Sequence, residues 1–181
     1  MFPCCIRLAQ PEDIPILGGV ERSAAAAFLA LPNHTPSYRT VPEDMLTEMA
    51  TGKKLWVATG DDDKIIGFVG CRCLDNILYV HEISVVYECQ KQGVGRQLML
   101  TVLNEAIKNE YAAVGLTTRR NAAWNMPFYK TLGFHELTEE RECPVLWRQL
   151  QSEINHGADP SIRCAMILSC YTLKLGISPV S

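Results

Sequence analysis

The sequence predicts an α/β fold in which a mixed β-sheet has helices on both faces. Short β-rich runs follow one another in the first half of the chain, and strand and helix patterns alternate in the second half. This order is typical of a mixed sheet covered by helices. The chain has 181 residues, of which 48% are hydrophobic and 20% charged, enough for one domain with its own hydrophobic core.

The N-terminal part predicts one strand followed by two helical regions. Residues 4–10 alternate in polarity and predict a short strand. A helix begins at Pro11, with acidic residues in its first turn, and continues through an alanine-rich stretch to Leu31. The proline-rich segment 31–42 predicts a loop, and a second helix begins around Pro42.

The middle of the chain predicts three successive strands and a long helix. Residues 55–74 form two β-rich runs around an acidic turn, which predicts a hairpin, and 78–87 predict a further strand. Residues 93–109 have an apolar face at helical spacing. Residues 112–119 then predict the next strand.

The C-terminal part predicts two helices and a last strand. A short helix in 126–134 is closed by Gly133, and a longer one, 144–157, ends at Gly157. Residues 163–173 alternate poorly and predict a strand buried on both faces, next to a strand near Phe134. We expect one domain over 1–168, with 169–181 as an extension of the last strand or a frayed tail.

Composition narrows the classes of function. The net charge of −3 gives no support for a nucleic-acid or anionic-membrane partner. The first 15 residues do not resemble a signal peptide, and no segment has the apolar length of a membrane span. The eight cysteines form no Cys-x-x-Cys pair, which favours free thiols over a zinc site and a cytoplasmic, or else nuclear, location. We therefore expect no metal.

Residues 92–99, QGVGRQLM, place two glycines at the start of the long helix. The first turn of a helix has backbone N–H groups without intrahelical acceptors, and glycines let an anion approach them closely. The pattern therefore predicts an anion site. The Walker pattern is absent, and Leu98 stands where a dinucleotide fingerprint needs its third glycine.

The segment QKQGVG, residues 90–95, resembles the Q/R-x-x-G-x-G/A signature of the GCN5-related N-acetyltransferases (GNAT). ISVVYECQKQGVGRQLM is similar to the strand–turn–helix of that family, and NMPFYKTLGF to its second motif. The resemblance implies a mostly antiparallel central sheet of about six to seven strands. It also implies acetyl-CoA as co-substrate and identifies 1–168 as an N-acetyltransferase domain.

The resemblance further implies how the coenzyme binds. Backbone groups of Ile83 and Val85 pair with its pantetheine arm. Its pyrophosphate is held by the backbone amides of Gln92, Gly93, Val94, Gly95 and Arg96. Gln90 is the first residue of the signature. Side chains of Lys91 and Arg96 either contact phosphate or form a solvated basic rim. Asn125 either contacts the coenzyme or the turn backbone, or caps the following helix.

Acetyl transfer to an amine requires a proton acceptor, an oxyanion donor and an acid for the leaving thiolate. By resemblance, Tyr129 is the acid and the Val85 amide the oxyanion donor. His81 is the first candidate for the base, because HEISV is similar to the H-x-L-x-V run of the arylalkylamine N-acetyltransferases, although Tyr79 stands where that group has a second histidine. Glu82 and Glu21 remain as alternatives. Other interpretations are core packing for Tyr129, a partly buried histidine that only shapes the pocket for His81, and a solvated helix face for Glu21.

The leading expectation for function is acetyl transfer from acetyl-CoA to a primary amine of a small molecule, by direct attack on the thioester. A protein or peptide amine is an alternative acceptor, and a non-catalytic acyl-CoA sensor is an alternative of another class. We expect the loop 31–42, the first helices and the strand pair near the C-terminus to select the acceptor. The chain is expected to be a monomer or a homodimer.

Overall fold

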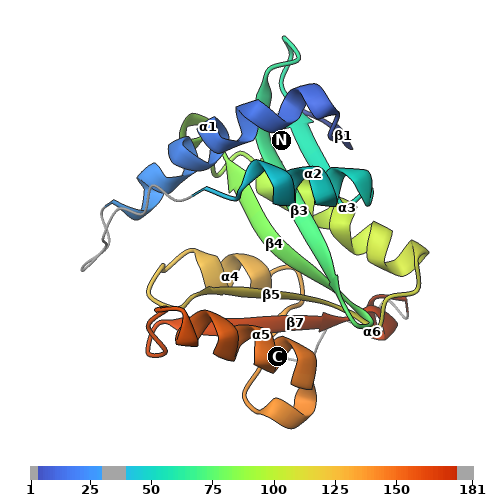
Figure 1. Ribbon diagram of the computed structural model, residues 1–181, viewed down its shortest axis with the longest axis vertical. Coiled ribbons are helices and arrows are strands. Elements are labelled where there is room, and N and C mark those ends of the chain that lie inside the picture. The colour runs from blue at the N-terminus through green and yellow to red at the C-terminus, as the bar shows by residue number, and fades with distance from the viewer. Residues whose placement is uncertain (1–3, 30–39, 175–181) are drawn as a thin grey trace. The chain divides into compact units, whose positions relative to one another are not determined.

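The computed structural model describes residues 4–29 and 40–174 (Figure 1). Its strands form a seven-stranded sheet in the order β1-β2-β3-β4-β5-β7-β6. The β4–β5 pair is parallel, and the pairs β1–β2, β2–β3, β5–β7 and β6–β7 are antiparallel. The predicted mixed, mostly antiparallel sheet is therefore confirmed. The strands are β1 (Cys5–Leu8), β2 (Leu55–Thr59), β3 (Ile65–Leu74), β4 (Ile77–Val85), β5 (Ala113–Arg119), β6 (His135–Glu136) and β7 (Arg163–Ser169).

Within the described residues, five helices lie in segments that the sequence predicts as helical, with bounds shifted by a few residues, and the sixth lies at 170–174, where a strand was predicted. They are α1 (Ile14–Ala24), α2 (Glu43–Thr51), α3 (Val94–Lys108), α4 (Asn125–Lys130), α5 (Pro144–Asn155) and α6 (Cys170–Lys174). Short 3-10 helices are η1 (Pro11–Asp13), η2 (Ala25–Phe28), η3 (Tyr87–Cys89) and η4 (Glu140–Glu142). The predicted loop 31–42 falls for the most part on residues 30–39, which lie outside the described residues.

The chain groups into two compact units, and each is described by itself. The first comprises Met1–Arg72 and His81–Val102, and the second comprises Cys73–Val80 and Leu103–Ser181. The long strands β3 and β4 and the helix α3 contribute residues to both units.

In the first unit, helices cover both faces of the sheet. On one face, α1 and α2 pack on β2 and β3 through the cluster Ile14, Leu17, Val20, Leu46, Met49, Leu55, Val57, Ile65 and Phe68. On the other face, a Cβ placed on Gly67 would lie 3.4 Å from Leu98 of α3 and 3.0 Å from the Ser84 carbonyl oxygen. Because Gly67 and Phe68 are successive strand residues, they point to opposite faces. The glycine thus allows α3 and β4 to approach β3 closely.

In the second unit, α5 packs on β4, β5 and β7. The shared core is Ile77, Tyr79, Ala113, Leu137, Cys143, Leu146, Leu150, Ala165 and Ile167. The middle of β7 is buried, as predicted, and β7 pairs with β5 on one side and with β6 on the other. The predicted neighbour near Phe134 is therefore confirmed as β6.

Two predicted strand ends are wrong. The predicted last strand runs to 173, but β7 ends at Ser169 and Cys170–Lys174 form the helix α6. The alternative in which 169–181 extend the last strand is therefore wrong for residues 170–174. The reason is that β5 begins at Ala113, the pairing partner of Ser169, so β7 has no ladder beyond it. The strand predicted over 78–87 ends at Val85, because the chain turns into η3, where the Cys89 N–H donates to the Val86 carbonyl at 2.8 Å. Residues 175–181 lie outside the described residues.

The structure adds three observations on composition. All eight cysteines are free thiols. Within 4–29 and 40–174, no three His, Cys, Asp or Glu side chains gather as a metal-binding group. None of the helices in the described part of the chain is long and apolar enough to cross a membrane.

Candidate active site

The start of α3, in the first unit, has the geometry of an anion site. Gly93 has φ +93°, a value that favours glycine, and its carbonyl accepts from the Gln97 N–H at 3.0 Å, the first bond of the helix. By helix geometry, the N–H groups of Val94, Gly95 and Arg96 lack acceptors within the helix. Lys91 and Arg96 are exposed on either side of Gly93. Partial positive charge and accessible side-chain cations therefore meet at one turn.

The glutamines of this turn have internal hydrogen bonds. The Gln90 side chain donates to the Val85 carbonyl at 3.0 Å and to the Ala24 carbonyl at 3.3 Å. The Gln92 side chain donates to the Glu88 carbonyl at 2.7 Å. Both side chains stabilise the turn. An anion bound here would therefore be contacted by the backbone amides and by the side chains of Lys91 and Arg96.

The predicted residues of β4 lie directly before this turn, also in the first unit. His81, Glu82, Ile83 and Val85 are all half-buried, and the Nδ1 atom of His81 is buried. The Ser84 hydroxyl donates to Glu82 Oε1 at 2.7 Å, so these two side chains lie on the same face of the strand. His81 and Glu82, one residue apart, therefore present their side chains to opposite faces of β4.

Glu21 of α1 has the electrostatics of a group that titrates near neutral pH. Both of its carboxylate oxygens lie 3.1 Å from the Val41 N–H, which donates to them. Burial, followed by the negative charge of Glu82, raises the pKa of Glu21 to about 7. The Val41 N–H and the charge of Arg22 act in the opposite direction. Two of the three predicted bases thus interact within one unit.

The second unit contains the other predicted residues. Tyr129, on α4, is 8% exposed, and its ring contacts Phe128 and Phe134 edge-on at centroid distances of 5.1 and 5.9 Å. The Asn125 side chain donates to Thr118 Oγ1 of β5 at 3.1 Å. The capping alternative for Asn125 is wrong, because Trp124 is the N-cap residue of α4 and no side chain caps that helix.

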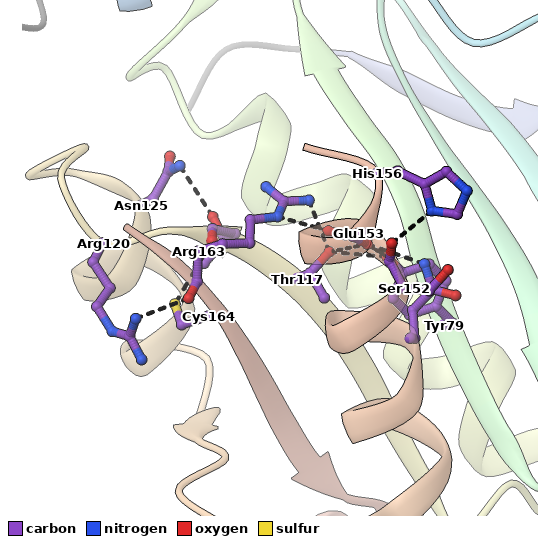
Figure 2. Close-up of polar contacts among 11 residues, drawn as sticks. Tyr79, Thr117, Arg120, Asn125, Ser152, Glu153, His156, Arg163 and Cys164 are labelled. Carbon is purple, nitrogen blue, oxygen red and sulfur yellow. Dashed lines mark hydrogen bonds and ion pairs between the residues drawn. The ribbon is translucent and has the colours of Figure 1, made fainter. Parts of the chain in front are cut away.

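A polar cluster that the sequence analysis did not predict lies in the second unit, centred on Glu153 of α5 (Figure 2). Its Oε1 accepts from the Tyr79 hydroxyl at 2.9 Å, the Thr117 hydroxyl at 2.8 Å and the Gln149 side chain at 3.0 Å. Its Oε2 accepts from Arg163 Nε at 2.7 Å, and Arg163 also donates to Thr117 at 2.8 Å. The cluster therefore joins β4, β5, β7 and α5.

Burial and the neighbouring charges determine the ionisation of Tyr79 and Glu153 in this cluster. Burial, and then the charge of Glu153, raises the pKa of Tyr79 far above its ordinary value. Burial would also raise the pKa of Glu153, but Arg163 and the hydrogen-bond donors hold it below its ordinary value. Tyr79, which occupies the position of the second histidine, is therefore a buried neutral phenol. No local motif marks this cluster, since its members are spread along the chain from Tyr79 to Arg163, and Tyr79 is 74 positions from its partner Glu153.

Comparison with known proteins agrees with the geometry of the turn. Residues 24–146 match the family described as "Acetyltransferase (GNAT) domain". The chain is 32% identical over 114 residues to the probable N-acetyltransferase camello of Xenopus laevis, a match that covers 59% of this chain and 52% of that protein. The chain thus spans about half the length of this curated relative.

Solved structures share the fold. The ribosomal-protein-S18-alanine N-acetyltransferase of Escherichia coli superposes with a TM-score of 0.65 at 19% identity, covering 93% of this chain and 94% of that one. The PaiA N-acetyltransferase of Thermoplasma acidophilum, solved in complex with coenzyme A, gives a TM-score of 0.70 at 16% identity, covering 93% and 99%.

Proposed function

The chain belongs to the acetyltransferase (GNAT) domain family, and on this premise we propose that it is an enzyme that transfers acetyl from acetyl-CoA to a primary amine. The observation that most supports this is the turn before α3. There, Gly93 in a left-handed conformation begins a helix whose first N–H groups have no acceptor within it. The family match spans both this turn and Tyr129.

The coenzyme is proposed to bind with its pyrophosphate against the backbone amides of residues 92–96. The exposed side chains of Lys91 and Arg96 add positive charge beside that position. The backbone of Ile83 and Val85, beyond the β4 residues 77–80 that pair with β5, receives the pantetheine arm. Gln90 and Gln92 have other side-chain partners and act on the coenzyme only through the shape of the turn.

The proposed reaction is direct attack of the neutral amine on the thioester carbonyl carbon. A C–N bond forms, the C–S bond breaks with its electron pair going to sulfur, and the amine gives up one proton. The Val85 N–H stabilises the oxyanion, and the Tyr129 hydroxyl gives a proton to the leaving thiolate. An alkylamine is mostly protonated at neutral pH, so a proton acceptor with a pKa near 7 suits this chemistry.

Glu21 is the proton acceptor that we favour among the three candidates. Burial and the charge of Glu82 place the pKa of its carboxyl at about 7. His81 is the second candidate, and Glu82 contributes through its charge. The bonds of Glu21 to the Val41 N–H give it the alternative role of holding the segment before α2.

For the acceptor, we propose a small-molecule amine, with a protein or peptide amine as the alternative. The names of the relatives do not decide between these classes, because those relatives share only the fold or half of their length with this chain. The eight free thiols suit a reducing compartment, so we place the enzyme in the cytoplasm, with the nucleus as the alternative.

The decisive experiment measures release of the CoA thiol from acetyl-CoA across a panel of small amines and peptides. Acetyl-CoA binding is measured in parallel by calorimetry. Turnover with small amines supports the proposal, and turnover with peptides alone supports the alternative acceptor. Binding of acetyl-CoA without turnover on any member of the panel would contradict the enzyme proposal and favour a sensor.

A further inference from the structure

Two hydrogen bonds tie the turn between β4 and α3 to the C-terminal end of α1. The Gln90 side-chain amide donates to the Ala24 carbonyl at 3.3 Å, and the Tyr87 N–H donates to the Ser23 hydroxyl at 3.1 Å. These pairs are 66 and 64 positions apart in the chain. We call this pair of bonds, from Gln90 to Ala24 and from Tyr87 to Ser23, the Gln90–Ser23 contact.

The chemistry of Gln90 makes it a branching point. A carboxamide NH₂ group has two donors, and Gln90 uses one for the Val85 carbonyl, at 3.0 Å, and the other for the Ala24 carbonyl. The end of β4 and the end of α1 are therefore held by one side chain. Carbonyls near a helix C-terminus run short of intrahelical donors, so the bond to Ala24 also stabilises the last turn of α1.

The two segments joined in this way have different tasks in the proposed reaction. Gln90 lies three residues before Gly93, where the coenzyme pyrophosphate is proposed to bind. Ala24 lies on the same helix as Glu21, one turn later, and the Ala25 N–H donates to the Glu21 carbonyl. A shift at the end of α1 would therefore move the proposed proton acceptor.

We propose that Gln90 is a positioning residue that couples coenzyme binding at the β4–α3 turn to the position of α1 and Glu21. This inference rests on the proposed function. When the pyrophosphate fixes the β4–α3 turn, the Gln90–Ser23 contact restrains the C-terminal end of α1. Without the coenzyme, the C-terminal end of α1 opens more readily. Ends of helices are among the regions that open locally, and binding that restrains them slows exchange of their amide hydrogens.

The test is hydrogen–deuterium exchange on the full chain, with and without saturating CoA, together with calorimetric measurement of CoA affinity. In the wild type, CoA should slow exchange of amides in residues 14–28 by about threefold or more. Gln90→Ala and Gln90→Glu should lose this protection, since neither supplies two donors. Their CoA affinity should fall by about threefold to tenfold, the size expected for loss of such hydrogen bonds.

Two further variants separate positioning from a general loss of stability. Gln90→Arg retains several N–H donors, and the family signature accepts arginine at this position, so it should keep the protection. Ser23→Ala removes the acceptor of the Tyr87 N–H, the second bond of the contact, and should lose part of the protection while every side chain of the turn stays in place. Gln151→Ala, at an exposed glutamine of α5, is the matched control and should behave as the wild type. Thermal melting confirms that each variant is folded.

The outcomes distinguish this inference from the proposed function. If the wild type does not bind CoA, the proposed function fails and the coupling fails with it. If the wild type binds CoA but folded Gln90→Ala, Gln90→Glu and Ser23→Ala keep the full protection of residues 14–28, the coupling alone is wrong. Loss of protection in Gln90→Arg equal to that in Gln90→Ala would also overturn it.

Discussion

Two carboxylates in the first unit, Glu21 and Glu82, interact through their charges. The negative charge of Glu82 is one cause, after burial, of the raised pKa of Glu21. A carboxyl with a pKa of about 7 is half-ionised at neutral pH, whereas an ordinary glutamate is almost fully ionised. This single residue therefore makes the proposed activity sensitive to pH in a testable way.

We expect kcat/KM to rise with pH through a midpoint near 7, because protonated Glu21 cannot accept a proton. Glu21→Gln should abolish this acidic limb and lower kcat/KM by about 10²-fold or more. Glu82→Gln should move the limb to lower pH, since it removes a charge that raises the pKa of Glu21. The measurement is a pH–rate profile for each variant.

The same profiles separate the alternative bases. Glu48→Gln, at an exposed position of α2, serves as the control and should keep the wild-type profile. Tyr129→Phe should lower kcat and keep the limb, because the phenol is proposed to act on the leaving thiolate and not on the amine. If His81→Gln removes the limb while Glu21→Gln retains it, His81 is the base, and Glu21 only holds the segment at Val41.

The second glycine of the turn allows a matched pair of substitutions. Gly95→Asp should abolish CoA binding, because a carboxylate would face the pyrophosphate at the start of α3. Gly95→Ala should retain binding, since the signature of the family accepts Gly or Ala there, and it should stabilise the helix by up to about 1 kcal/mol. Calorimetric CoA titration and thermal melting measure the two effects. Equal CoA affinity in both folded variants would contradict the proposed pyrophosphate position.

At the scale of elements, short sequence patterns were sufficient to predict helices and strands whose signals lie within a few residues. The two glycines, the apolar face of α3 and the alternation of β4 lie within short windows, and they predicted β4 and the start of α3, while the anion site stays a prediction. Gln90 was predicted from its signature, but its bond to Ala24, 66 positions away, depends on how α1 and β4 pack. The end of β7 at Ser169 similarly depends on where β5 begins. Neither has a local signal.

The Glu153 cluster is the clearest case of an element-scale interaction without a motif, and it predicts a pH-dependent stability. Glu153→Gln should destabilise the fold by about 2 kcal/mol at pH 7, since the carboxylate accepts from three side chains and pairs with Arg163. The pKa of Glu153 is held below its ordinary 4.5, so this stabilisation is present above that pH and is lost as pH falls further. Urea unfolding at several pH values measures it.

A surface ion pair provides the control for this prediction. Glu139 pairs with Arg141 at 2.6 Å, but the Arg141 side chain is 83% exposed. Exposed pairs contribute little, so Glu139→Gln should change the free energy of unfolding by less than about 1 kcal/mol. Equal effects of Glu139→Gln and Glu153→Gln would show that the cluster does not join α5 to the sheet.

At the scale of the whole molecule, β7 determines whether the second unit can form. It pairs with β5 over seven residue pairs and with β6 on its other side. A chain that stops after Leu150 lacks β7 and leaves both neighbours with unpaired edges, so we expect it to be insoluble. A chain that stops after Lys174 keeps β7 and α6 and should remain soluble. Expression and sedimentation compare the two, and cooperative unfolding of the 1–150 chain would contradict this account.

The position of β7 between β5 and β6 also has a consequence for synthesis on the ribosome. β5 emerges more than forty residues before the strand that pairs with it, as the register of Ala113 with Ser169 and of Arg119 with Arg163 requires. During that interval one edge of β5 remains unpaired, and α5, once it has been made, lacks the part of its core that β7 supplies. Contacts between distant segments form slowly, and exposed strand edges favour aggregation. The second unit should therefore depend on chaperones that hold the nascent chain, and slowing translation after α5 should increase its misfolding.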